Sequence, residues 1–92
     1  MIKSWKHKGL RRFFETGTKS GIQAAHEKRL KIILQRLSAA ISPEDMNTPG
    51  MNLHKLLGNR TGFYSVSVNG NWRIIFKFNH YDVVDVDYID YH

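Results

Sequence analysis

The second half of the sequence carries the residue types that acid–base chemistry on a phosphodiester requires. They are two imidazoles, a carboxylate, a phenol and two guanidinium groups, on His54, Arg60, Arg73, Asp90, Tyr91 and His92. In RNA cleavage a base takes the proton of the 2′-hydroxyl, an acid protonates the leaving 5′-oxygen, and arginine stabilises the charge of the phosphorane. Histidine suits both proton transfers because it titrates near neutrality. These residue types are therefore compatible with a ribonuclease, although no local motif among them is diagnostic.

The same residues also admit a structural interpretation. His92 would stand in solvent, an arginine would pair with Asp85 or Asp87 across a sheet, and a tyrosine would cap the core. A metal site is disfavoured, because the histidines show no H-x-x-x-H or comparable ligand spacing. The sequence also lacks a glycine-rich phosphate loop of the P-loop or Rossmann kind.

Arg73 follows the turn of a predicted hairpin. Residues 64–68 and 72–78 alternate apolar and polar side chains on the two sides of Asn69, Gly70 and Asn71. A strict two-residue turn at Asn69 and Gly70 would mix core and surface residues on both faces of the hairpin. A three-residue loop, with glycine in a left-handed position, places the core residues on one face of the hairpin and the surface residues on the other. This loop predicts that Val68 pairs with Trp72, Val66 with Ile74 and Ser67 with Arg73. The mostly polar face then carries Arg73, Ser65, Ser67 and Lys77.

The other candidate residues lie at the ends of short elements. Residues 84–89 alternate in the same way and predict a third antiparallel strand, after a second turn at residues 79–82. That strand brings the terminal residues 90–92 to one place. His54 and Lys55 project from a short segment, residues 53–57, between two loops, the second of which contains Arg60. Loops beside a rigid sheet are where binding and catalytic residues concentrate.

Two N-terminal helices are predicted to cover the apolar face of the hairpin. The first spans Gly9 to Glu15, with Leu10, Phe13 and Phe14 on its core stripe and Gly17 as C-cap. The second spans Ile22 to Ile41, and its apolar stripe consists of Leu30, Ile33, Leu34, Leu37 and Ile41. His26 is expected at its surface. Residues 2–5 suggest a short edge strand, and residues 42–45 a capped helical turn. The predicted fold class is α+β, with helices on one side of a small antiparallel sheet of three to four strands.

Composition and charge indicate one small domain with a polyanionic partner. Residues 1–92 suit a single core, and without cysteine the fold must depend on packing. The net charge is +6, and residues 1–36 hold ten of the fourteen basic residues beside only two acidic ones. This asymmetry favours nucleic acid, ahead of an acidic protein or an anionic membrane, while a merely solvated surface is the alternative. No signal peptide or membrane-spanning run is evident, so we expect a cytoplasmic protein.

Several segments together resemble the HigB toxins of the RelE/ParE superfamily. The strongest parts of the resemblance are Trp72 and Arg73 after the hairpin turn and the terminal Asp90, Tyr91, His92. Residues 53–56, 58–62 and 68–74 fit as well, and so do residues 2–4 and 8–10, so that the resemblance covers essentially the whole chain.

The resemblance implies a type II toxin that enters the A site of the 70S ribosome and cuts translated mRNA without a metal or other cofactor. It also implies a HigA-like antitoxin with a helix-turn-helix domain, and a RelE-like fold that agrees with the pattern above. Its active-site residues correspond to His54, Arg73, Asp90, Tyr91 and His92, and we expect Lys55, Arg60 and Lys77 to contact RNA. The family often has Lys where this chain has Leu57, so Lys55 or Arg60 would have to replace that contact.

Two other functions remain open at this stage. A ParE-like toxin would share the fold but poison DNA gyrase, and the ending Asp90, Tyr91, His92 argues against it. A non-catalytic RNA-binding domain would explain the charge, but not the clustering of His, Asp and Arg at strand ends. The sequence leaves undecided the codon preference, the identity of the antitoxin, the oligomeric state and the division of acid and base roles between His54 and His92.

Overall fold

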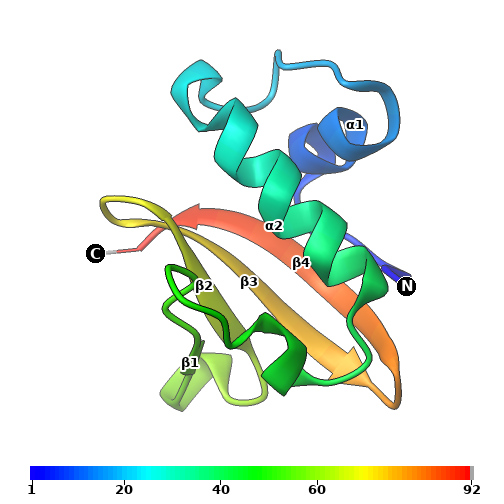
Figure 1. The fold of residues 1–92 in the computed structure, drawn as a ribbon, viewed down its shortest axis with the longest axis vertical. Helices are drawn as coiled ribbons and strands as arrows, with labels where there is room; N and C mark the ends of the chain where they lie inside the picture. Colours follow the sequence, from blue (N-terminus) through cyan, green and yellow to red (C-terminus); the bar gives the residue numbers. More distant parts are fainter. Residues whose placement is uncertain (92) are drawn as a thin grey trace.

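The computed structural model describes residues 1–91, and this part of the chain forms an α+β fold, as predicted. Helices α1 (Lys8–Thr16) and α2 (Glu27–Ala39) lie on one side of an antiparallel sheet (Figure 1). The strands are β1 (His54–Lys55), β2 (Tyr64–Asn69), β3 (Trp72–Asn79) and β4 (Asp82–Asp90), and they follow one another in the sheet in chain order. Short 3-10 turns lie at η1 (Ala24–His26), η2 (Pro43–Met46) and η3 (Gly58–Arg60).

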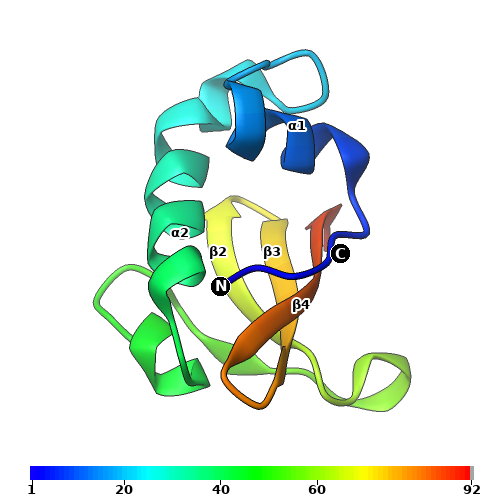
Figure 2. The ribbon, with the colours of Figure 1, turned by 90° about the vertical axis from the view of Figure 1, so that its right-hand side faces the viewer.

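The N-terminal segment extends the sheet beyond β4, which confirms the predicted edge pairing in outline. Ile2 and Trp5 form isolated parallel bridges with Val83 and Val86, and the segment crosses beside β4 in Figure 2. Helix α1 then starts at a capping histidine, because Nδ1 of His7 accepts the N–H of Leu10 at 2.9 Å. The segment thus covers the outer edge of β4, opposite the edge that carries β1.

The two helices correct three details of the prediction. Phe14 is 39% exposed and packs against Trp5 instead of joining the core stripe. Helix α2 is shorter than predicted and ends at Ala39, because the carboxylate of Asp45 accepts the N–H of Ile41 at 2.9 Å and Pro43 follows. Ile41 is therefore 59% exposed. His26, expected at the surface, is buried where η1 meets the sheet.

The hairpin register is confirmed at the two pairs that place Arg73. Val66 pairs with Ile74 and Ser67 with Arg73. The predicted pairing of Val68 with Trp72 is wrong, since Asn69 pairs with Trp72 and Val68 is the extra residue of a β-bulge. The turn therefore contains two residues, 70 and 71, and the bulge absorbs the third residue of the predicted loop.

The third predicted strand is confirmed as β4, but its side chains do not alternate without interruption. Asp85 has φ of 55°, and the register of β4 against β3 shifts there. Because of this bulge, Val83 and Val86 both face the core, whereas Val84 pairs with Lys77 on the opposite face. The shift gives β4 the twist that carries its end toward the hairpin turn.

The core lies between the helices and the sheet, and a smaller cluster lies on the other face. The main core includes the α2 side chains Leu30, Ile33, Leu34 and Leu37. On the face of Arg73, Leu56, Phe63 and Ile75 are buried with Ile89 beside them. This face is less polar than predicted, because β1 and the loop around η3 fold over part of it.

Candidate active site

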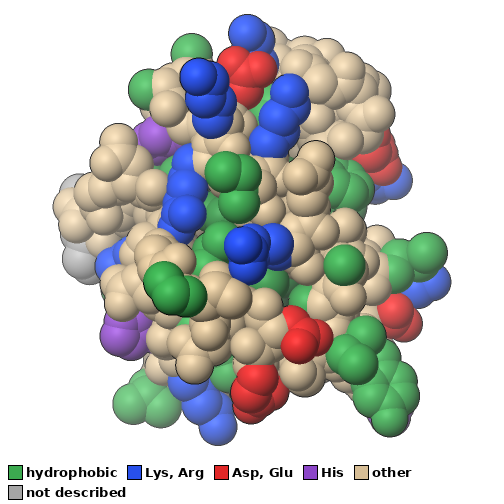
Figure 3. All heavy atoms as spheres, viewed as in Figure 1, with side chains coloured by type: hydrophobic (Ala, Val, Ile, Leu, Met, Phe, Trp, Pro, Cys, Tyr) green, Lys and Arg blue, Asp and Glu red, His purple; other side chains and the backbone are tan. Residues whose placement is uncertain are grey.

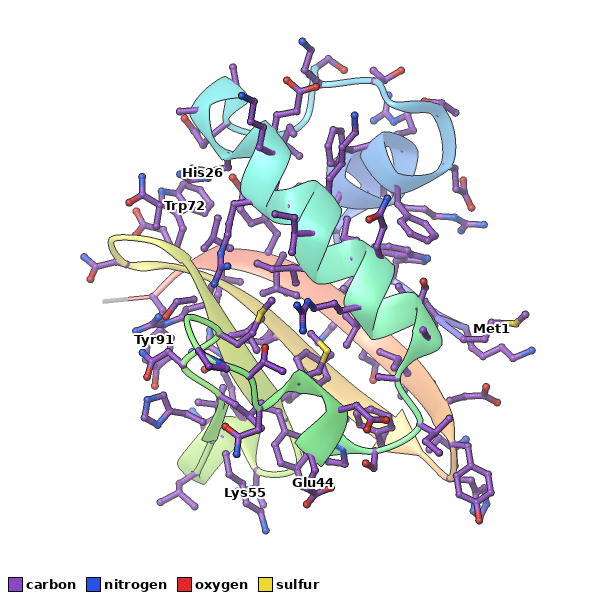
Figure 4. The ribbon with its side chains drawn as sticks, viewed as in Figure 1. Met1, His26, Glu44, Lys55, Trp72 and Tyr91 are labelled. Carbon is purple, nitrogen blue, oxygen red and sulfur yellow. The ribbon has the colours of Figure 1, made fainter. Side chains whose placement is uncertain are left out.

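An open depression of about 350 Å³ lies on the face of the sheet away from the helices. Residues of β1 and its flank, the centre of the sheet and the chain end form its walls: His54, Lys55, Leu56, Leu57, Ser65, Arg73 and Tyr91. Tyr91 and Lys55 lie on the same side of the molecule in Figure 4, one at the end of β4 and one on β1. The structure therefore brings together three of the five predicted catalytic residues, His54, Arg73 and Tyr91.

The sheet register explains why these three side chains meet. His54 pairs with Ser65 at the β1 edge, and Ser67, two residues farther along β2, pairs with Arg73 on β3. The backbone N–H of Tyr91 donates to the carbonyl of Asn71 at 2.7 Å, which holds the chain end beside the hairpin turn. Segments far apart in sequence are thus fixed by backbone hydrogen bonds, and the site has a rigid base.

Among residues 1–91, Arg73 contacts a serine and forms no ion pair with a carboxylate. Its Nη1 donates to the hydroxyl of Ser67. Asp85 accepts a hydrogen bond from Ser4, and Asp87 accepts the backbone N–H of Tyr88, so neither contact supports the cross-sheet ion pair of the structural interpretation. The guanidinium is half-buried beside the depression and keeps other N–H groups that can reach an anion there.

Arg60, Lys77 and Asp90 do not line the depression. Arg60 stacks its guanidinium over the ring of Tyr91 at 5.4 Å, and Lys77 places Nζ 4.7 Å from the ring centre of Phe63. Asp90 pairs with Trp72 at the end of β4 and is exposed, but it does not line the depression. His92 lies outside the described residues. Leu57 is 82% exposed at the rim, so a lysine at this position would project into the same space.

The two residues that link His54 to Arg73 were not among the predicted site residues. The side-chain amide of Asn52 donates to Ser67 Oγ at 3.2 Å, and its oxygen lies 3.1 Å from Nε2 of His54. Ser67 is therefore a junction between Asn52 and Arg73. The predicted register could have indicated Ser67, because it places this hydroxyl opposite Arg73, but no pattern in the sequence indicates Asn52.

Arg29 of α2 holds the loop before β1 against β2. Its guanidinium donates to the carbonyl of Ser67, at 3.2 Å from Nε and 3.0 Å from Nη2, and also to the carbonyl of Gly50. The N–H of Ser67 donates to the carbonyl of Met51 at 2.9 Å. A signal for Arg29 did exist in the sequence, since it precedes Ile33 by four residues and so lies at the edge of the apolar stripe of the helix.

An aromatic cluster supports the hairpin from the helix side. Nδ1 of His26 lies 2.6 Å from the Tyr88 hydroxyl, and Trp72 packs against both rings. Burial raises the pKa of Tyr88, and a hydrogen bond from the Gln23 N–H offsets only part of this effect. Figure 4 shows His26 and Trp72 side by side between α2 and the turn. Trp72 thus anchors one face of β3, while Arg73 points to the other.

The face shown in Figure 3 carries both basic and acidic side chains. Lys and Arg side chains are spread over the side that carries α2 (Figure 3). Within residues 1–91 no three His, Asp or Glu side chains form a group that could hold a metal ion. The described part of the chain also contains no helix long and apolar enough to cross a membrane.

Comparison with known proteins agrees with the resemblance that the sequence motifs suggested. A sequence model described as "RelE-like toxin of type II toxin-antitoxin system HigB" matches residues 3–92. The protein named "Endoribonuclease HigB" from Proteus vulgaris is 42% identical over 92 residues, which is the full length of both chains. A match that extends over nearly every residue includes the hairpin, β1 and the chain end that form the depression. The chain therefore belongs to the HigB family of RelE-like toxins, the toxins of type II toxin–antitoxin systems.

Proposed function

We propose that this chain is a metal-independent endoribonuclease toxin that cuts translated mRNA in the ribosomal A site and so inhibits translation. The observation that carries the proposal is the meeting of His54, Arg73 and Tyr91 at one depression with Lys55 at its wall. Its support from the comparisons is membership of the HigB family and the name of the Proteus vulgaris relative.

The residues at the depression suit in-line cleavage by the 2′-hydroxyl. His54 and His92 share the two proton transfers, one as base and one as acid. The Arg73 guanidinium, held by Ser67, stabilises the additional negative charge of the phosphorane. Asp90 and Tyr91 complete the site at the end of the chain, and the Tyr91 ring holds the Arg60 guanidinium above it. Arg60, Lys55 and Lys77 bind RNA phosphates on either side of the scissile bond.

The partners of the toxin follow from the same assignment. A type II toxin has an antitoxin, and we infer that this one is a HigA-like protein with a helix-turn-helix domain. The basic side chains of residues 1–36 bind ribosomal RNA through phosphate contacts. The protein acts in the cytoplasm, where ribosomes translate.

Mapping of RNA ends after incubation with translating ribosomes tests this function. We expect new 5′ ends within ribosome-bound mRNA, poor cleavage of the same mRNA without ribosomes, and no cleavage by His54→Ala. Equal cleavage of naked and ribosome-bound mRNA would refute the ribosome dependence. Inhibition of DNA gyrase without RNA cleavage would favour the ParE-like alternative, and RNA binding without any new ends would favour the non-catalytic one.

A further inference from the structure

The side chain of Asn52 bridges the two halves of the proposed active site. It lies between Ser67 Oγ, at 3.2 Å from its Nδ2, and His54 Nε2, at 3.1 Å from its Oδ1. Ser67 Oγ in turn accepts from Nη1 of Arg73. Three hydrogen bonds therefore link His54 to Arg73 through Asn52 and Ser67, and both ends of this chain line the depression.

The direction of these bonds determines which nitrogen of His54 carries a proton. The guanidinium of Arg73 can only donate, so Ser67 Oγ accepts from it. Asn52 Nδ2 donates to the same oxygen, which turns Oδ1 of the amide toward His54. An amide oxygen can only accept, and Nε2 of His54 must therefore carry its hydrogen. In the neutral ring the lone pair then lies on Nδ1.

We propose that Asn52 is a positioning residue for RNA cleavage, which fixes the ring orientation and tautomer of His54 so that Nδ1 exchanges the proton with the RNA. The inference rests on the proposed function, because it assumes that His54 transfers a proton. The link through Ser67 also sets His54 and Arg73 at a fixed separation, as attack and charge stabilisation at one phosphate require.

The backbone at Asn52 supports a positioning role and not a packing role. Its φ of 52° lies in the left-handed region, which asparagine tolerates better than most residues with a side chain. The side chain is exposed and its hydrogen bonds are to Ser67 and His54. Neighbouring contacts hold this conformation, because Arg29 binds the Gly50 carbonyl and Met51 accepts from the Ser67 N–H. Loss of the amide therefore changes the site without opening the core.

Replacing the neutral amide of Asn52 by a carboxylate tests its contact with His54. Lys55, Arg73 and Tyr91 are the other titratable groups of the depression, so no carboxylate lines it within the described residues. Asn52→Asp keeps an acceptor for Nε2 and adds a negative charge that favours the imidazolium. The limb of the pH–rate profile governed by His54 then moves to higher pH, whether His54 acts as base or as acid. The moved limb thus shows that the side chain at position 52 contacts His54, and the rate of a variant without this side chain shows whether the contact positions the ring.

The experiment compares single-turnover cleavage on ribosomes from pH 5.5 to 9 for wild type, Asn52→Asp and Asn52→Gly. Glycine deletes the side chain while tolerating the left-handed backbone, and we expect a loss of about 10- to 100-fold in rate, similar to the loss when a residue that orients a metal-bound histidine is removed. Exposed Asn47→Asp controls for the added charge. His80→Gly controls for glycine, because His80 also has a positive φ, of 56°, at the other turn.

The controls should keep the wild-type rate and pH profile, and all variants should keep a melting temperature within a few degrees of wild type. A wild-type rate for Asn52→Gly would overturn the inference, and so would an unmoved profile for Asn52→Asp, because it would show that position 52 does not contact His54. In that case the proposed function survives if His54→Ala still abolishes cleavage. A fully active His54→Ala would overturn both the catalytic assignment and the role of Asn52.

Discussion

Replacing Arg73 by alanine separates catalysis from structure most sharply. In the folded chain Arg73 is half-buried, and its contact with Ser67 is a single hydrogen bond of the kind that contributes about 0.5–1.5 kcal/mol to stability. Loss of about 1 kcal/mol lowers Tm by roughly 4–8 °C in a domain of this size. Loss of a preorganised donor to the phosphorane costs about 10²–10³ in rate, or roughly 2.7–4 kcal/mol of transition-state stabilisation. The free energy lost from transition-state stabilisation should therefore be about three times the free energy lost from folding stability.

The assay measures single-turnover cleavage of one codon on stalled ribosomes, with melting curves of the same preparations. Arg73→Lys keeps the charge but not the planar fork of donors, and we expect it to recover only part of the rate. Lys77→Ala is the matched comparison, because Lys77 lies on the same face of β3 but over Phe63. That variant should weaken RNA binding while nearly preserving kcat. An Arg73→Ala protein that melts far below wild type and regains full activity at low temperature would refute the catalytic reading.

Three further outcomes follow from the structure. Toxin dialysed against EDTA before addition to ribosomes should cut at the normal rate and leave 2′,3′-cyclic phosphate ends, and products with only 3′-hydroxyl ends would contradict attack by the 2′-hydroxyl. Arg29→Met should lower the cleavage rate about tenfold and speed amide exchange at Met51 and Ser67, because it removes charged hydrogen bonds of roughly 1.5–3 kcal/mol. Lys28 is exposed, so the control variant Lys28→Met should change neither the rate nor the exchange. Burial raises the pKa of Tyr88, so the unfolded chain loses this phenolic proton first as pH rises above about 10, and the free energy of unfolding should fall there. In urea titrations at pH 8–11, Tyr88→Phe should make this fall less steep. An unchanged slope would contradict the role of Tyr88.

The sequence alone sufficed for the placement of Arg73, and the reason is the two-residue period of strands. Only one register puts Val66 opposite Ile74 and Ser67 opposite Arg73 while keeping one face apolar, and the structure has that register. The length of the turn was harder to predict. A three-residue loop and a two-residue turn with a bulge at Val68 place Arg73 on the same face, so the pattern cannot distinguish them.

The errors of prediction arise where tertiary contacts override local pattern. His26 is polar and precedes an amphipathic helix, yet it is buried because Tyr88 and Trp72 enclose it from β4 and β3. Ile41 continues the apolar spacing of α2, but Asp45 captures its N–H and the helix ends first. In both cases the deciding partner comes from outside the helical window, where periodicity carries no information.

The anchoring of β3 on both faces suggests why the site can be rigid in so small a domain. Trp72 packs against His26 and Tyr88 on the helix side, and the adjacent Arg73 is fixed by Ser67 on the other. Arg29 of α2 donates to the carbonyl of Ser67. The contacts that hold Trp72 and Arg73 thus both involve residues at or next to the start of α2, His26 and Arg29. A movement of α2 would therefore shift Arg73 and the Asn52 loop together. The contacts of Trp72 with the core and the hydrogen bonds that hold Arg73 therefore involve neighbouring residues, and we expect substitutions on the core side of Trp72 to reduce cleavage along with stability.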